Sequence, residues 1–283
     1  MNRSWMFVLA ASLLAAPASS QTLDASAELM RTLTEAPGPS AFEESVREIV
    51  VREFEDLGAD IRFDGLGSVL ATVPGGAGGP VVMVTAHLDE VGLMVQYITP
   101  DGFIRVKALG GWLRQALPDQ RWTILGSDGP VMGISGIRTV HVTPAAQRER
   151  VWALEEIFLD VGATSRDEVE AMGVRPGDGI APLSDFAVLA NERYAAKAWD
   201  DRVGLAVMLV AARRIRDEGI QVPSEVVWVA TTQEEIGLRG AQTAVALAEP
   251  EIGISIEAGV AADFPGIGPT QAQERLGGGP GMF

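Results

Sequence analysis

The chain of 283 residues contains no cysteine and only two histidines. The absence of cysteine excludes disulfides, thiolate nucleophiles and cysteine-based metal sites. It also fits exported bacterial proteins that fold without disulfides. Because histidine is so scarce here, the position of each imidazole is informative, and any zinc-type site is expected to combine histidine with carboxylates.

Basic residues are also few, with 22 Lys and Arg against 38 Asp and Glu, which gives a formal net charge of -16 at pH 7. Neither nucleic acid nor an anionic membrane attracts such a surface, so we expect neither as a partner. Much of the acidic surplus serves solubility. Part of it can also line a cleft whose charge a cation must neutralise.

Long apolar runs are absent except at the start, where residues 5–16 follow a short basic segment and precede the small residues 16–18. This run is too short for a membrane anchor, the alternative interpretation. Its order of regions is typical of a secretory signal peptide, which we assign to residues 1–20. The protein is therefore expected to be exported, periplasmic or secreted, with no membrane association after signal cleavage.

Helical spacing of apolar residues predicts helices over residues 26–33 and 41–57. Ser40 precedes the second segment, and Glu43 follows three residues later. This spacing is that of a capping box, in which the serine accepts a hydrogen bond from the backbone of the third residue. We therefore predict that Ser40 caps the second helix.

Strand signals indicate an α/β fold. Residues 60–72 alternate like a hairpin, and the continuous apolar runs 81–85 and 226–232 are typical of strands buried on both faces. Residues 253–256 are predicted to form a third such strand, and residues 203–217 a helix. The expected architecture is a mixed, mostly parallel sheet flanked by helices.

Residues 92–191 have a different texture, with short strands between turns about 8–12 residues apart, which is typical of a small all-β body. One short helix begins at Ser165, with Glu168 again at capping-box spacing. We predict that this region is an insert domain. Residues 21–91 and 192–283 are then the two parts of the α/β domain.

Three short acidic stretches lie at the ends of predicted strands or at the start of a helix. They lie at residues 86–90, 199–202 and 233–235 and contain His87, Asp89, Asp200, Glu234 and Glu235, and Glu257 follows the predicted strand 253–256. Sites in open α/β sheets gather beyond the carboxyl ends of strands. Imidazole with carboxylates is the ligand set of zinc or a similar first-row ion. Two such ions can activate water and polarise a carbonyl, so the pattern favours a hydrolase.

Each stretch also has a simpler explanation. A lone histidine after a strand is usually structural, paired acids are usually a solvated face, and acids beside Trp199 suit a helix N-terminus. The three stretches together favour an enzyme. A glycosidase is an alternative, but it needs two separated carboxyl groups and no metal. The set of His87, Asp89 and Asp200 argues against that alternative.

These stretches carry a close resemblance to the M42 peptidases, a family of glutamyl and tetrahedral aminopeptidases sometimes labelled endoglucanases. The resemblance runs from Leu33 to the last residues. Its motifs stand here as Ala86-His87-Leu88-Asp89-Glu90-Val91-Gly92, Ala198-Trp199-Asp200-Asp201-Arg202-Val203-Gly204 and Gln233-Glu234-Glu235-Ile236-Gly237. It implies a zinc-peptidase-like fold, with residues 92–191 as a β-rich dimerisation domain through which the protein forms a homo-oligomer.

The resemblance also implies residue roles in the hydrolysis of N-terminal residues from peptides. His87 would bind one metal ion, Asp200 would bridge two, and Glu235 would bind the second. Glu234 would be the general base, and Asp89 would orient His87. The implied cofactors are two divalent ions, zinc first, with cobalt or manganese as alternatives.

The chain departs from the family pattern in three places. Glu257 stands where the family usually has a metal-binding aspartate, so it is expected to be a ligand. Ala41 replaces a common glycine. The family also supplies a metal-binding histidine near its C-terminus, and the sequence to Phe283 has none, since His141 matches a non-ligand position. We therefore expect a C-terminally truncated chain with weak second-metal binding, and the alternative function is a relative that binds peptide or metal without turnover.

Overall fold

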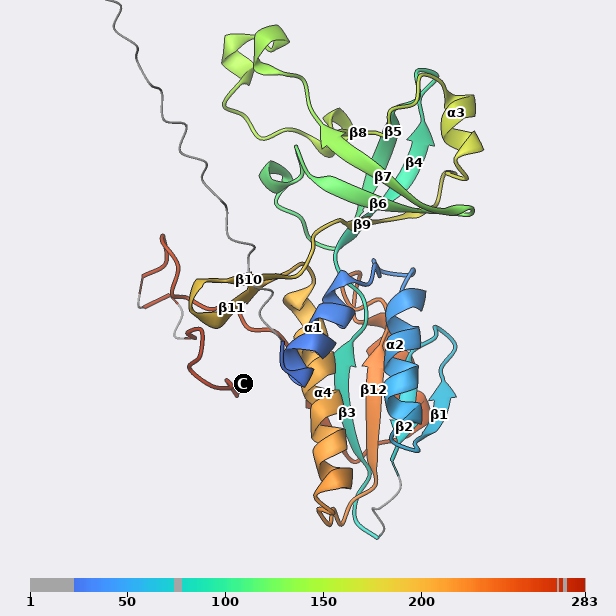
Figure 1. Cartoon of the computed structure of the whole chain (residues 1–283), viewed down its shortest axis with the longest axis vertical. Coiled ribbons are helices and arrows are strands. Elements are labelled where there is room, and N and C mark those ends of the chain that lie inside the picture. Colours follow the sequence, from blue (N-terminus) through green and yellow to red (C-terminus); the bar gives the residue numbers. More distant parts are fainter. Residues whose placement is uncertain (1–22, 74–77, 269, 272–273, 283) are drawn as a thin grey trace, which may run out of the picture.

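The computed structural model describes residues 23–73, 78–268, 270–271 and 274–282. The predicted signal peptide therefore lies outside the described residues. An α/β body occupies one end of the molecule, and a β-barrel occupies the other (Figure 1). In the part of the chain that is described, no helix combines the length and apolar character that a membrane crossing requires.

The α/β body is built on a five-stranded mixed sheet in the order β1-β2-β12-β3-β13. The strands are β1 (Asp60–Phe63), β2 (Val69–Thr72), β3 (Val82–His87), β12 (Val226–Thr231) and β13 (Ile252–Ser255). The hairpin β1–β2 lies antiparallel to β12, whereas β12, β3 and β13 run parallel. The predicted mixed sheet is confirmed, and the carboxyl ends of its three parallel strands lie at one edge.

Helices cover both faces of this sheet, as predicted. One face carries α1 (Ala25–Glu35), α2 (Glu44–Glu55) and α4 (Trp199–Asp217), whose apolar side chains form one core with Trp228 and its neighbours. The other face carries α5 (Arg239–Ala248), which packs on a smaller core. Because successive side chains of a strand point to opposite faces, β12 contributes to both cores.

The second predicted helix starts later than its sequence pattern indicates. Glu43 is the N-cap residue of α2 and makes no capping hydrogen bond with its side chain. Ser40 is buried, and its hydroxyl contacts another part of the chain. Ala41 has a φ of 73°, which glycine adopts readily and alanine does not. The prediction that Ser40 caps this helix is therefore wrong, because the backbone turns at Ala41 before the helix begins.

The short helix α3 (Arg166–Ala171) begins as predicted, since the Ser165 side chain accepts a hydrogen bond from the backbone N–H of Glu168. The predicted helix 203–217 ends as expected at Asp217, and Gly219, at a φ of 63°, follows its last turn. The helix α5 is not among the sequence-based predictions.

The region between the two parts of the sheet forms a closed barrel in the order β4-β5-β8-β7-β6-β9. Its strands are β4 (Gly92–Ile98), β5 (Ile104–Leu109), β6 (Arg121–Gly126), β7 (Gly129–Gly136), β8 (Phe158–Asp160) and β9 (Gly179–Pro182). A hairpin of β10 (Ala187–Leu189) and β11 (Arg193–Ala195) then returns the chain to α4. The predicted domain boundaries at 91/92 and 191/192 stay predictions.

Five single turns of 3-10 helix complete the described elements. They are Arg114–Ala116, Val140–Val142, Ala145–Gln147, Leu154–Glu156 and Ala190–Glu192.

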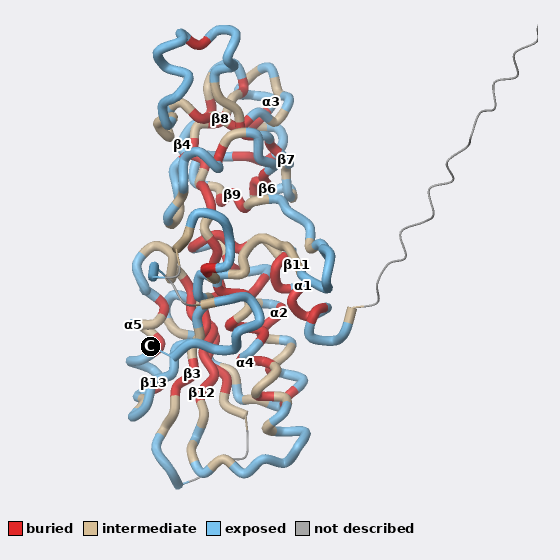
Figure 2. Tube along the Cα trace, turned by 90° about the vertical axis from the view of Figure 1, so that its left-hand side faces the viewer, coloured by how far each residue is buried: buried red, intermediate tan, exposed pale blue. Residues whose placement is uncertain are grey.

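Two glycines allow the barrel to pack closely against the segment before α2. A Cβ atom on Gly92 would lie 2.4 Å from Cβ of Pro39 and 2.8 Å from the carbonyl oxygen of Ile180. A Cβ atom on Gly179 would lie 2.6 Å from the ring of Phe42. Buried residues accordingly continue from the sheet into the barrel in Figure 2, whereas β13 is exposed along its length.

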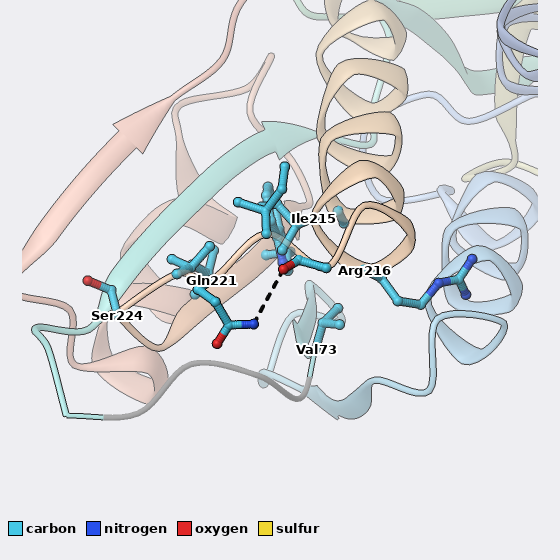
Figure 3. A pocket seen from close by; sticks show the side chains of 11 residues that line it. Val73, Ile215, Arg216, Gln221 and Ser224 are labelled. Atoms are coloured by element: carbon cyan, nitrogen blue, oxygen red, sulfur yellow. Dashed lines mark hydrogen bonds between the residues drawn. The ribbon is translucent and has the colours of Figure 1, made fainter.

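A cavity of about 200 Å³ lies at the opposite end of the sheet from the carboxyl ends of the parallel strands. Figure 3 shows side chains from α4, from the following loop and from the start of β12 around it, among them Ile215, Arg216 and Gln221. None of the six predicted site residues lines this cavity.

The cap of α3 gives a stability prediction. Ser165→Ala removes the acceptor for the Glu168 N–H, so the free energy of opening α3 should fall by about 1 kcal/mol. Faster amide hydrogen exchange across residues 166–171 would report this loss. Ser184→Ala, at an exposed position, is the control. Unchanged exchange in the Ser165 variant would contradict the cap.

Candidate metal centre and active site

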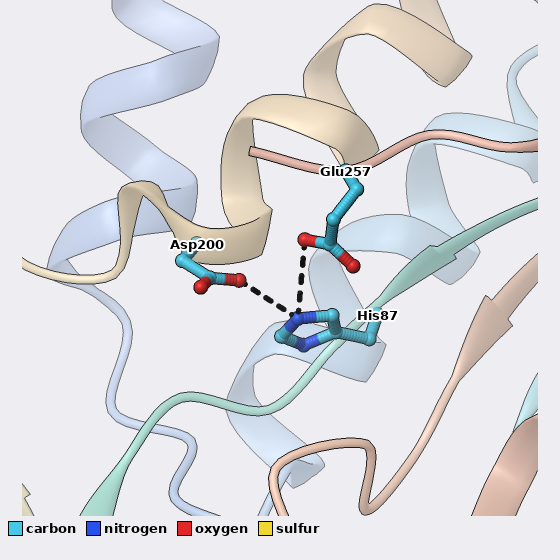
Figure 4. Close-up of side chains that lie close together, drawn as sticks. All are labelled: His87, Asp200 and Glu257. Atoms are coloured by element: carbon cyan, nitrogen blue, oxygen red, sulfur yellow. Dashed lines mark hydrogen bonds and ion pairs between the residues drawn. The ribbon is translucent and has the colours of Figure 1, made fainter. Parts of the chain in front are cut away.

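The structure brings together side chains from the ends of three elements around His87. His87 is the last residue of β3, Asp200 lies in the first turn of α4, and Glu257 follows β13. The Nε2 atom of His87 lies 2.9 Å from Oδ1 of Asp200 and 3.7 Å from Oε1 of Glu257. Figure 4 shows the two carboxylates converging on one edge of the imidazole.

A second pair of carboxylates reaches the same imidazole from the turn after β12. Oε2 of Glu234 lies 3.7 Å from Nε2 of His87. His87, Glu234 and Glu235 each offer one ligand atom within 4.8 Å of the others, as do His87, Asp200 and Glu257. The predicted site residues therefore assemble. The division of roles between Glu234 and Glu235 stays a prediction, since both carboxylates approach His87.

The orientation of His87 is set by Asp89. Nδ1 of His87 lies 3.0 Å from the backbone carbonyl oxygen of Asp89 and 3.5 Å from its carboxylate oxygen Oδ1. An Nδ1–H donating to that carbonyl leaves the lone pair of Nε2 facing Asp200. Orientation by the carboxylate of Asp89 was the prediction, but the backbone carbonyl is the nearer partner.

Asp201 is a buried residue to which sequence reasoning assigned no role. Its Oδ2 accepts a hydrogen bond from the backbone N–H of His87 at 3.2 Å, and its Oδ1 accepts one from Gly204 at 3.1 Å. The second bond is that of a helix N-cap, and the φ and ψ angles of Asp201 are non-helical. The sequence signal that could have indicated this role is an aspartate three residues before a glycine of the predicted helix. Asp201 thus joins the end of β3 to the start of α4.

A buried ion-pair network lies beside the centre and was also missed. Oε1 of Glu90 accepts hydrogen bonds from Nζ of Lys197 at 2.6 Å and from the backbone N–H of Gly38 at 3.0 Å. The buried Arg202 donates to the carbonyl oxygen of Leu33 at 2.6 Å and lies 3.6 Å from Glu90. These charges are paired with each other, and the network anchors the segment around Asp200 to the chain before α2.

The centre concentrates negative charge, and the pKa values show the effect. Burial, followed by repulsion from Asp200, raises the pKa of Glu235 to about 7. Burial also raises the pKa of Asp201 to about 7. Burial alone lowers the pKa of His87, but hydrogen bonds to Asp200 and Asp89 outweigh it and raise the value to about 11. The arrangement therefore favours a positive charge among the carboxylates.

The donor set fits a divalent cation. One imidazole nitrogen and carboxylate oxygens from separate elements lie within a few ångström of one another, and that combination suits zinc and related first-row ions. A cation at this position would balance the repulsion from Asp200 that adds to burial in raising the pKa of Glu235. Asp200 and Glu257, which are half-exposed or more, leave the centre open to solvent on one side.

Comparisons with known proteins show which family resembles this chain. The sequence profile of the M42 glutamyl aminopeptidase family matches residues 67–283. The chain is 37% identical to the putative aminopeptidase FrvX of Escherichia coli over 90% of its own length and 70% of that protein. It thus spans about seven tenths of this curated relative.

Solved structures are similar as well. A TET aminopeptidase from a marine sediment archaeon of the Thaumarchaeota is 40% identical, with a TM-score of 0.87 over 90% of this chain and 71% of that one. The TET1 peptidase of Pyrococcus horikoshii, which can assemble into a tetrahedron or a large octahedral shell, is 28% identical. Its TM-score is 0.74, over 82% of this chain and 68% of that one.

The pKa shifts predict how stabilisation by metal depends on pH. Asp201 and Glu235 have folded pKa values of about 7, above their ordinary values of 3.8 and 4.5. The metal-free protein therefore loses stability as pH rises from these ordinary values to about 7. The raised pKa of His87 acts in the same direction: its stabilising contribution is complete below pH 6.5 and is lost as pH rises towards 11. A bound cation relieves the carboxylate repulsion and competes with protons.

The rise in Tm caused by saturating zinc should therefore be larger at about pH 8 than at about pH 5. Differential scanning calorimetry with and without zinc measures it. His87→Ala, which removes the imidazole ligand, is the control and should abolish most of the rise. A zinc effect that is equal at both pH values would contradict the prediction.

Proposed function

The chain belongs to the M42 family of aminopeptidases, and we propose that it removes N-terminal residues from peptides at the centre around His87. The observation that carries this proposal is the convergence of one imidazole and four carboxylates at the carboxyl edge of the sheet. An imidazole and carboxylates that can hold metal ions at an open site are one arrangement that hydrolyses peptide bonds.

We propose two divalent ions as cofactors, with zinc as the first candidate and cobalt or manganese as alternatives. His87 and Glu257 would hold one ion, Glu235 the other, and Asp200 would bridge them. When bound, such ions supply Lewis-acid polarisation of the carbonyl and lower the pKa of water. The buried Nδ1–H contact to Asp89 supports this assignment, because it fixes the tautomer that presents Nε2 as a ligand.

Glu234 is the proposed general base. Its carboxylate, 27% exposed, is more accessible than the imidazole of His87, which is 2% exposed. In this role it takes a proton from the attacking water and delivers it to the amine nitrogen of the departing peptide. The backbone N–H of Glu234 is held by Oδ1 of Asp89 at 2.8 Å, which limits the positions that the carboxylate can reach.

Self-association through the barrel is a further part of the proposal. The assembly of the similar TET1 peptidase supports it. So does an outward apolar face on β7, where Met132 and Ile134 are 58% and 48% exposed. Large exposed apolar side chains that share one strand face are typical of protein contacts.

Export to the periplasm or the medium is proposed from the signal-type sequence of residues 1–20 alone. The lack of cysteine is compatible with that destination. Cell fractionation of the protein with and without residues 1–20 tests the proposal, and equal retention of both forms in the cytoplasm would refute it.

The role of Glu234 leads to a kinetic prediction. Glu234→Gln keeps the size and the oxygen of the side chain but removes the base, so kcat should fall by about 10²–10⁴ while metal content is unchanged. Steady-state hydrolysis of an aminoacyl-anilide, with elemental analysis of the protein, measures both. Glu235→Gln is the comparison and should lower metal content. Metal loss in the Glu234 variant instead would reverse the two assignments.

The apolar face of β7 leads to a prediction about assembly. Replacing Met132 and Ile134 together by lysine should reduce the particle mass measured by light scattering, because two charges would have to be buried at the contact. Val207→Lys, on the exposed side of α4, is the control for an added surface charge. An unchanged mass for the double variant would exclude this face as the contact.

A further inference from the structure

Three consecutive backbone N–H groups in the turn after β12 donate to two buried carboxylates. The N–H of Gln233 donates to Oε1 of Glu43 at 3.1 Å. The N–H groups of Glu234 and Glu235 donate to Oδ1 and Oδ2 of Asp89 at 2.8 and 3.1 Å. The turn that carries two site carboxylates is therefore attached along its backbone to the chain before α2 and to the end of β3.

Glu43 joins two strained positions. The same oxygen that accepts from Gln233 also accepts from the N–H of Ala41 at 2.8 Å. Ala41 and Gln233 have φ values of 73° and 55°, in the left-handed region that non-glycine residues seldom adopt. Such a conformation is unfavourable for a residue with a side chain and persists where surrounding contacts enforce it. One buried carboxylate thus stabilises both turns at once.

Ser40 supports the second carboxylate. Its hydroxyl donates to Oδ2 of Asp89 at 2.6 Å, and both side chains are fully buried. That donor limits the rotation of the Asp89 carboxylate, which also accepts from Glu234 and Glu235. A charged acceptor makes this a stronger hydrogen bond than one between neutral groups.

Burial of Glu43 has a cost, which argues that its place has a specific use. The side chain is 1% exposed, and burial raises its pKa. Its closest cationic neighbour, Arg47, lies 3.7 Å from the other carboxylate oxygen. A helix N-terminus alone does not require such burial, since an exposed serine or aspartate serves that purpose.

We propose that Ser40 and Glu43 are positioning residues for the peptidase reaction: they hold the backbone of residues 233–235 so that the carboxylates of Glu234 and Glu235 face His87. Glu43 acts directly on Gln233, and Ser40 acts through Asp89. Neither side chain needs to touch the substrate. This inference rests on the proposed function for its kinetic consequence, but the attachment of the turn can be measured without turnover.

Two variants remove the contacts with little change in volume. Glu43→Met removes the acceptor for Gln233, and Ser40→Ala removes the donor to Asp89. Each should lower kcat for an aminoacyl-anilide by about 10–100-fold, with KM and metal content unchanged. In the metal-free protein, amide hydrogen exchange of residues 233–235 should become faster. Glu43→Gln keeps an oxygen acceptor and should restore both properties.

Two further variants separate positioning from general stability. Ser135→Ala removes an equally buried hydroxyl inside the barrel, where it accepts from Nε1 of Trp122 at 3.0 Å. It should change neither kcat nor the exchange at 233–235. Ala41→Gly added to Glu43→Met relieves strain in the first turn only. The double variant should recover thermal stability but not kcat, because Gln233 still lacks its acceptor.

The outcomes distinguish the two proposals. Unchanged exchange at 233–235 in both Glu43→Met and Ser40→Ala would overturn the positioning role, whatever the activity. Recovery of kcat in the Ala41→Gly double variant would also overturn it, since stability alone would then explain the loss. A third outcome is that the wild-type protein hydrolyses no peptide with zinc, cobalt or manganese, while the two variants still exchange faster at residues 233–235. That result would refute the proposed function but would establish the attachment of the turn.

Discussion

Repulsion among carboxylates at one edge of the sheet is the constraint on which the rest of the structure depends. Burial raises the pKa of Asp201 and Glu235 to about 7, and only one imidazole lies among them. Such a cluster is unfavourable unless a cation balances it and backbone donors hold each oxygen. The chain supplies such donors to two buried carboxylates: the N–H groups of His87 and Gly204 donate to Asp201, and those of Glu234 and Glu235 donate to Asp89.

The parallel part of the sheet solves the geometric side of the same problem. β3, β12 and β13 end at one edge, so short turns after them deliver side chains that are distant in sequence to a common point. Asp89 then fixes two of these turns relative to each other, because its carbonyl contacts His87 and its carboxylate holds the turn after β12. Figure 4 shows Asp200 and Glu257 approaching His87 from separate elements.

Local sequence patterns predicted what depends on local physics. The buried strands β3 and β12, the hairpin and the end of α4 follow from hydrophobic period and turn chemistry, and the structure confirms them. The third predicted buried strand forms as β13, but it is exposed along its length, so its predicted burial is wrong. The serines at 40 and 165 have the same capping-box spacing, yet only Ser165 caps a helix. Ser40 instead bonds a residue 49 positions away, and Glu43 one 190 positions away. Spacing cannot reveal a partner so distant in sequence.

In the site too, the sequence predicted the features that depend on local patterns and missed those that depend on distant contacts. Motif positions predicted which residues meet at His87, because each lies at the end of a recognisable element. The contribution of Asp201 and the network of Glu90, Lys197 and Arg202 depend on burial, which acidic and basic letters in a sequence do not indicate. The helix α5 was missed because it lacks the usual signals at its ends: its N-cap residue Leu238 offers no capping side chain, and Glu249 rather than glycine follows its last residue.

The barrel is inserted between two halves of the centre, and this limits how the protein can be rearranged. The chain enters the barrel at Gly92, directly after Asp89 and Glu90, and returns through β11 directly before Asp200. Gly92 and Gly179 leave no room for a Cβ atom against the segment before α2. The barrel is therefore not an interchangeable module. A foreign domain inserted at these points would have to reproduce the spacing of both connections, because otherwise Asp200 would no longer lie at its present distance from His87.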